Sequence, residues 1–217
     1  MQLTKYAHAT VVLEDAGQQV LVDPGAFTPN APDLLAAATA VLVTHEHVDH
    51  FAAEHVRSAL AARRDVRLWG PAAVAAALQD TDAAREGRVT AVEGGETLDI
   101  GGIEVRVFGG DHAQIHDGIA VPRNVGYLIK GRVFHPGDSY IVPGVDVNTL
   151  LVPASGPWVK VGDAIDFIKA VSPRQTVQIH DAMLSEIGRT STGMFLGETG
   201  LTGTSMLILA AGESIEA

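Results

Sequence analysis

Residues 43–51 read VTHEHVDHF and place His45, His47, Asp49 and His50 within six positions. Imidazole nitrogen and carboxylate oxygen, without thiolate, suit zinc and also admit iron or manganese. On an extended segment, His45 and His47 point to the same side, while Asp49 and His50 follow as the chain turns toward a helix. One strand end can therefore serve two adjacent metal ions. The zincin signature His-Glu-x-x-His does not apply, because the fifth position counted from His45 is Asp49.

The composition limits the classes of fold and partner. A chain of 217 residues, 47% of them hydrophobic, can bury one sizeable core, so we expect a single domain over residues 1–217. The formal net charge of −11 disfavours nucleic acid and anionic membranes as partners and favours a small-molecule substrate. A homo-oligomer is left open.

Cysteine usage and the N-terminal sequence bear on the compartment. The chain has no cysteine, which excludes disulfides and thiolate ligands. The first residues lack the basic segment and apolar run of a secretory signal, and no uncharged apolar run reaches about 18 residues. We therefore expect a cytoplasmic protein.

Strand-like segments and helix-like segments alternate along the chain. HATVVLE and QQVLVD, separated by DAGQ, predict an antiparallel hairpin, and the apolar run TAVLVTH ends at the histidine cluster. Periodicity predicts helices over 33–38, 52–64, 71–78 and 161–172, and strands over 66–70, 88–92, 103–109, 125–130, 132–135, 175–180 and 204–210. The glycine-rich segment 190–205 is expected to be either a flap over the site or a connection. Strands followed by helices, occurring twice, predict an α+β fold of two packed sheets with helices outside.

The ordered motifs add a family resemblance. HEHVDH resembles the His-x-His-x-Asp-His motif of the metallo-β-lactamase-fold hydrolases, and the other motifs of that family occur around it in order. These are LVDPG with Asp23, GGDHA with His112, HPGDS with Asp138 and VQIHDA with His180. The resemblance covers about residues 5–212 and implies a four-layer αββα sandwich with two mixed sheets. KYAHATVVLE and NVGYLIKGRVFHPGDS look most like the small branch that includes sugar-phosphate lactonases and uncharacterised zinc-dependent hydrolases.

The resemblance also implies a two-metal site and a reaction. It assigns His45, His47 and His112 to one divalent ion, Asp49, His50 and His180 to the other, and Asp138 to a bridging position, with Asp49 and Asp138 as the catalytic carboxylates. Zinc is the expected ion, with manganese and iron as alternatives. Hydroxide bridging the two ions would cleave an ester, lactone or phosphoester bond. Asp23 would orient a metal-bound imidazole, although DPG also fits an Asx turn.

Six other residues are candidates for substrate contact: His8, His116, Arg123, Asn124, Trp158 and Lys160. His8, in an alternating N-terminal strand, either faces the metal cleft or is a hydrogen-bonded structural residue. Arg123 or Lys160 could hold a phosphate or carboxylate, and Trp158 could stack on a ring or simply pack. His135 is either a substrate contact or a residue at the sheet edge, whereas His55 fits a solvated helical face.

Two other function classes stay open. One is a noncatalytic metabolite-binding module that retains its metal for stability. The other is a di-iron oxidoreductase, since related folds can hold two irons. The absence of cysteine excludes a β-lactamase of the thiolate-ligand kind, and the acidic charge disfavours transfer-RNA processing. Within the hydrolase class, the family resemblance suggests a phosphorylated sugar lactone as the substrate, and no other feature of the sequence bears on this choice.

Overall fold

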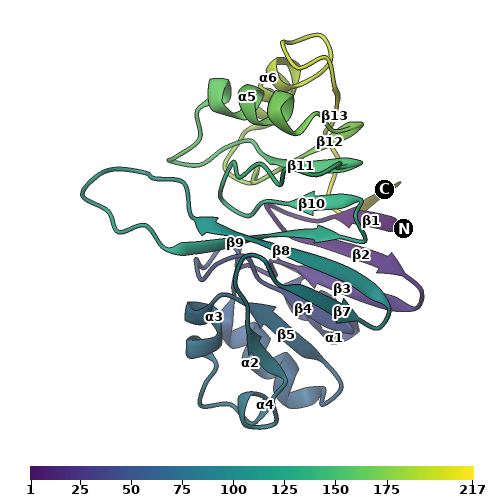
Figure 1. The fold of residues 1–217 in the computed structure, drawn as a ribbon, viewed down its shortest axis with the longest axis vertical. Coiled ribbons are helices and arrows are strands. Elements are labelled where there is room, and N and C mark those ends of the chain that lie inside the picture. The colour runs from purple at the N-terminus through teal and green to yellow at the C-terminus, as the bar shows by residue number, and fades with distance from the viewer.

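Two seven-stranded mixed sheets face each other in a computed structural model that describes all 217 residues (Figure 1). The first sheet has the order β14 (Glu213–Glu216), β1 (Gln2–Lys5), β2 (Val11–Asp15), β3 (Gln18–Val22), β4 (Ala40–Leu42), β5 (Arg67–Gly70) and β6 (Val89–Ala91). The second has the order β13 (Ser205–Leu207), β12 (Gln175–Ile179), β11 (Thr149–Pro153), β10 (Val133–His135), β9 (Arg123–Ile129), β8 (Ile103–Asp111) and β7 (Thr97–Ile100).

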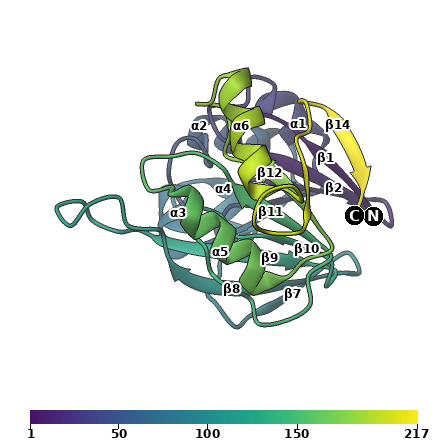
Figure 2. The same cartoon turned by 90° about the horizontal axis from the view of Figure 1, so that it is seen from above.

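Helices cover the outer face of each sheet (Figure 2). The first sheet carries α1 (Ala31–Ala37), α2 (Ala53–Ala62), α3 (Ala72–Ala77) and α4 (Asp82–Arg85), and the second carries α5 (Val161–Val171) and α6 (Glu186–Leu196). One buried cluster fills the space between the sheets, and two others fill the sheet–helix interfaces. The predicted α+β, four-layer αββα fold is therefore confirmed.

The β2–β3 hairpin shows how the local sequence sets the sheet. Ala16 and Gly17 form its turn with φ of 50° and 79°, and two positive φ angles are what a tight turn needs to match strand twist. In β2, Val11 and Leu13 face the core between the sheets, while Val12 packs toward the helices. Because both faces are covered, the strand is a continuous apolar run rather than an alternating one.

Several predicted elements differ from the structure. The glycine-rich segment is no flap, because α6 runs through it to Leu196, whose side chain is buried in the cluster under α5. The strand expected over 204–210 is only β13, and the chain returns to the first sheet as β14, which pairs with β1. His8 does not lie in a strand but in the turn between β1 and β2. Short strands β7 and β11 were not predicted.

The helices of this fold are short. None of them is both long enough and apolar enough to cross a bilayer.

Candidate metal centre

Most residues of the candidate centre follow the carboxyl ends of strands. Asp23 follows β3, His45 follows β4, Asp138 follows β10 and His180 follows β12. The β3–β4, β10–β11 and β11–β12 pairs are parallel, so within each sheet these ends share an edge. Two bonds tie the sheets together at that edge: the Val125 amide donates to Thr44 O at 2.9 Å and the Tyr127 hydroxyl donates to Val43 O at 2.9 Å.

The seven predicted ligands lie together at this edge. The potential ligand atoms of His45, His47 and His112 lie within 4.8 Å of one another, and so do those of Asp49, His50, His180 and His8. Asp138 lies between the two groups: its Oδ2 is 3.2 Å from His112 Nε2, and its Oδ1 is 3.1 Å from His50 Nε2. The structure thus groups the residues as the resemblance assigned them, and their roles as ligands stay a prediction.

The outer nitrogens of three histidines are held by hydrogen bonds. His50 Nδ1 donates to Asp23 Oδ2 at 2.7 Å, and His112 Nδ1 donates to Ala113 O at 2.6 Å. Thr44 Oγ1 donates to Asp23 Oδ2 at 2.8 Å and so accepts from His45 Nδ1 at 3.0 Å. In each ring, Nε2 is therefore the nitrogen available to a metal, as metal-binding imidazoles require. Fully buried Asp23 thus orients two imidazoles, that of His50 directly and that of His45 through Thr44.

Buried polar atoms without partners show that the centre fits metal ions. His50 Nε2, Asp138 Oδ1 and both ring nitrogens of His180 are buried and make no hydrogen bond. Unpartnered buried polar groups are uncommon because each costs its full desolvation energy. Divalent cations would satisfy these atoms, and a donor set of imidazoles and carboxylates suits zinc, manganese or iron.

The electrostatics favour ionised carboxylates, neutral imidazoles at His45 and His47, and protonated imidazoles at His50 and His180. Burial lowers the pKa of His45 and His47, so both are neutral at pH 7. Burial opposes ionisation of Asp138, but the charge of His50 and the close approach of the His50, His112 and His180 rings hold its pKa well below the ordinary value. Burial likewise opposes a charged His180, yet the nearby carboxylates of Asp138 and Asp49 raise its pKa to about 9. The pKa of His50 is also raised, against its burial, by Asp138 and Asp23.

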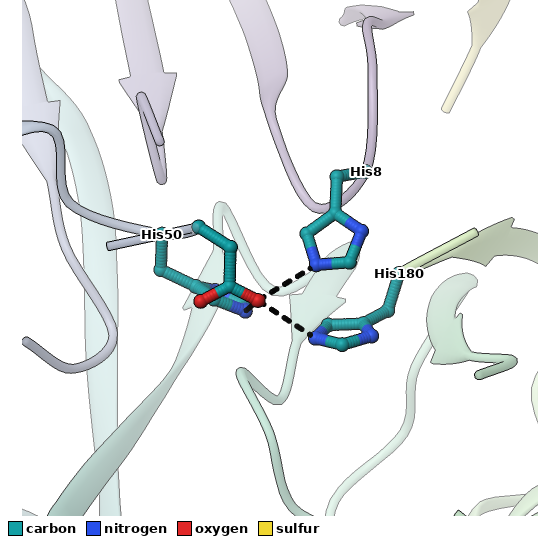
Figure 3. A group of neighbouring side chains, drawn as sticks. His8, His50 and His180 are labelled. Atoms are coloured by element: carbon teal, nitrogen blue, oxygen red, sulfur yellow. Dashed lines mark hydrogen bonds and ion pairs between the residues drawn. The ribbon is translucent and has the colours of Figure 1, made fainter. Parts of the chain in front are cut away.

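His8 connects the two segments that carry Asp49 and His180, and Figure 3 shows it beside His50 and His180. Its ring lies 3.8 Å from that of His180 between centroids, and its carbonyl accepts from the His180 amide at 3.0 Å. Its Nδ1 accepts from the Ala182 amide at 3.4 Å, which leaves the proton on Nε2, 3.0 Å from Asp49 Oδ2. His8 is fully buried with φ of 59°, so the structure places it behind Asp49 as a hydrogen-bond donor.

Asn124 and Trp158 both hold Asp138. The Asn124 side chain, which is buried, accepts from the Asp138 amide at 3.0 Å and donates to Pro136 O and to Ser139 Oγ. It has no free group for a substrate, so its predicted substrate contact does not fit the structure. Half-buried Trp158 donates from Nε1 to Asp138 Oδ2 at 3.0 Å and still presents part of its ring to solvent.

The other candidates are not part of the metal-binding groups. Arg123 and Lys160 are exposed, and they pair with Asp111 at 2.6 Å and Asp163 at 3.3 Å. His116 is exposed on the β8–β9 connection, which projects from the fold in Figure 1. His135 is a buried structural residue whose Nε2 donates to Ala9 O at 2.9 Å. His55 is exposed on α2, as its helical pattern predicted.

Three supporting features were missed by sequence reasoning. Thr44 could have been noticed, because it directly precedes His45. Lys5 and Asp181, next to His180, form a buried ion pair at 3.0 Å that anchors the His180 segment to β1. Gly25 is required by close approach, because a Cβ there would lie 1.7 Å from Asp49 O. The pairing of Lys5 and Asp181, far apart in sequence, left no local signal.

Comparison with known proteins identifies the family. Residues 2–180 match the model of the β-lactamase superfamily domain. The chain belongs to this family. It is 33% identical to protein Rv0786c of Mycobacterium tuberculosis, with 96% of each chain covered. It is 31% identical to UPF0173 protein PF0020 of Pyrococcus furiosus, with 86% of each covered.

Solved structures share the fold at low sequence identity. Igni18, a metallo hydrolase from Ignicoccus hospitalis, superposes with a TM-score of 0.71 and 17% identity, covering 99% of this chain and 97% of Igni18. CmlA, a diiron β-hydroxylase from Streptomyces venezuelae, gives a TM-score of 0.73 at 18% identity, covering all of this chain and 54% of CmlA. The predicted superfamily, its fold and an enzyme of this superfamily are confirmed at that level.

Proposed function

We propose that this protein is a dinuclear metal-dependent hydrolase that cleaves an ester, lactone or phosphoester bond of a small metabolite. The observation that carries the proposal is the convergence of seven imidazole and carboxylate side chains, among which His45, His50 and His112 have their outer nitrogens fixed by hydrogen bonds. Superfamily membership supports the same reading. Two divalent ions, with zinc expected, would supply an activated water and polarise the bond to be cleaved.

The chain's own residues would position this chemistry. His45, His47 and His112 form one binding group, Asp49, His50 and His180 form the other, and Asp138 lies between them. Trp158 and Asn124 fix the Asp138 carboxylate and its backbone, so this carboxylate is held before a metal arrives. Such preorganisation lowers the cost of binding ions and substrate in one geometry.

A single experiment tests the proposal. Elemental mass spectrometry of protein purified without chelator or histidine tag should give about two metals per chain, the number expected of a two-metal site. The same preparation should hydrolyse members of a panel of esters, lactones and phosphodiesters. Asp138→Asn should abolish turnover in folded protein, whereas Asp166→Asn, on the exposed face of α5, should not. Undiminished hydrolysis in Asp138→Asn would show that the proposed chemistry is wrong.

The same preparation discriminates a second candidate. The likeness to CmlA and the nitrogen and oxygen donor set leave a di-iron oxidoreductase as the alternative. Iron as the bound metal, with a visible absorption band that bleaches on reduction, would favour that alternative. Full activity with redox-inert zinc would favour hydrolysis. Tight binding of a metabolite that is never turned over would point instead to a noncatalytic binding module.

A further inference from the structure

Exposed apolar side chains recur beside the candidate ligands. Five loops each carry one large hydrophobic residue within four positions of a residue of the centre. These are Phe27, Val48, Ile115, Val142 and Met183, whose side chains are between 37% and 63% exposed. Single exposed apolar residues are ordinary, but their repetition on five loops of one centre is a pattern. A spacing of four residues spans at most roughly 14 Å, so each lies within that distance of a residue of the centre.

Aromatic rings approach the histidine cluster on two sides. The Phe27 ring lies 5.1 Å from the His8 ring, which in turn lies against His180. The Trp158 ring lies 5.9 Å from His112 and 6.2 Å from His180. Both aromatics are partly open to solvent, so they can receive an apolar or aromatic group beside the reacting bond.

A shallow groove of about 470 Å³ extends from Val48 over the start of α2. Its apolar lining includes Ala26, Phe51 and Ala52, and its polar lining residues are Glu46, Glu54 and His55. The Ala26 amide donates to Val48 O at 2.8 Å, which fixes the groove to the loop that carries His47 and Asp49. An alkyl group could lie in it, whereas a phosphate would meet the two carboxylates.

Cations for an anionic substrate are lacking in the loops of the centre. Residues 24–30, 43–52, 112–123, 138–160 and 181–185 contain only two lysine or arginine residues, Arg123 and Lys160. Each already pairs with a carboxylate of its own, Asp111 or Asp163. Recognition of phosphate commonly uses a free guanidinium or ammonium group. These loops offer none.

We infer that the centre takes an uncharged ester or lactone whose alkyl or aryl group lies on the apolar rim formed by Phe27, Val48, Ile115, Val142 and Met183. The inference rests on the proposed hydrolase function and narrows its substrate class. It replaces the phosphorylated sugar lactone that the family resemblance had suggested. The metal centre would bind the reacting carbonyl, and the rim would bind the apolar remainder.

Binding of alkyl hydroxamates to the zinc-loaded protein tests the rim without requiring turnover. We expect the Kd, measured by calorimetry from acetohydroxamate to octanohydroxamate, to fall about two- to fourfold per added methylene, because partial burial of each methylene adds affinity. A phosphorylated sugar hydroxamate of matched length should bind at least about tenfold more weakly than hexanohydroxamate. A flat series, or tighter binding of the phosphorylated compound, would overturn the inference.

Matched variants locate the effect. Val48→Ser and Met183→Ser should each reduce the gain per methylene without changing zinc content. Leu201→Ser is the control, because Leu201 is 73% exposed in the α6–β13 connection, away from the carboxyl end of β12. An unchanged chain-length series in both rim variants would refute the assigned rim.

Hydrolysis of γ-lactones with increasing alkyl tails, measured in parallel, separates the two proposals. Turnover together with a Kd that does not change with chain length would support the proposed hydrolase function and overturn the proposed apolar rim. A steep binding series in a zinc-loaded protein that hydrolyses no member of the panel supports the rim and refutes the hydrolase.

Discussion

Replacing His8 by asparagine tests whether this residue orients a ligand of the second ion. Asparagine tolerates the left-handed backbone that His8 adopts at φ of 59° better than most residues, so the turn should survive. Its side chain is too short to span from the turn to Asp49 Oδ2, which His8 Nε2 reaches at 3.0 Å. The Asp49 carboxylate then loses its hydrogen-bond donor, and the ring contact with His180 is removed.

The size of the effect follows from the contacts that are lost. Hydrogen bonds to a metal-binding carboxylate typically contribute 10- to 100-fold in metal affinity, about 1.4–2.8 kcal/mol. We expect that loss for the ion of Asp49, His50 and His180, and little change for the ion of His45, His47 and His112. Titration of metal-free protein with zinc against a chromophoric chelator should resolve two affinities in the native protein. In His8→Asn only one of these two zinc affinities should change.

His55→Asn is the control for removing an imidazole, because His55 is exposed on α2. It should leave both affinities unchanged. If His8→Asn remains folded and binds both ions as tightly as the native protein, His8 does not orient Asp49. An equal loss at both sites would indicate a general disturbance of the fold instead.

Three further predictions concern protons and stability. In metal-free protein at pH 7, His50 and His180 carry protons because their pKa values are raised, that of His180 to about 9. Zinc uptake should therefore release about two protons, which calorimetry would detect as a binding enthalpy that depends on the buffer. The stability that a protonated His180 contributes is complete below its ordinary pKa of 6.5 and is lost as the pH rises through about 9. Metal-free protein should therefore unfold at a lower temperature at pH 9.5 than at pH 6.5. An equal or higher Tm at pH 9.5 would contradict this reasoning. The Gln178 side chain is fully buried, and neither its amide nitrogen nor its amide oxygen has a hydrogen-bond partner. Gln178→Met should therefore raise the free energy of unfolding, measured by urea denaturation, by about 1–3 kcal/mol. A loss of stability would show that the amide has a partner.

The ligand motifs could be predicted because each is a local pattern at a strand end. The strand before His45 is an apolar run, and the chain must turn where that run stops, so the polar side chains collect at the sheet edge. The same reasoning located Asp138 and His180. Short strands gave less signal: β7 reads TLDI, with two polar positions in four, and its pairing with β8 decides its conformation.

Residues that act through distant partners could not be predicted in the same way. Asn124 was expected to contact substrate because it lies between ligand motifs, yet it faces the backbone of Asp138. Sequence position showed only that Asn124 is near the centre. The direction of its side chain depends on the pairing of β9 with β8 and β10, which places it behind Asp138 rather than at the mouth.

The same dependence explains why the second binding group needs the whole chain. His180 belongs to the second sheet, but its amide is bonded to His8 O, and its neighbour Asp181 is paired with Lys5 of the first sheet. Strand β1, which carries Lys5, is itself paired with the last strand, β14. The group of Asp49, His50 and His180 therefore forms only when both sheets and the chain ends have assembled. Metal binding at that group should favour the fully folded state over any partly folded one, because unfolding of β1 or β14 disperses its ligands.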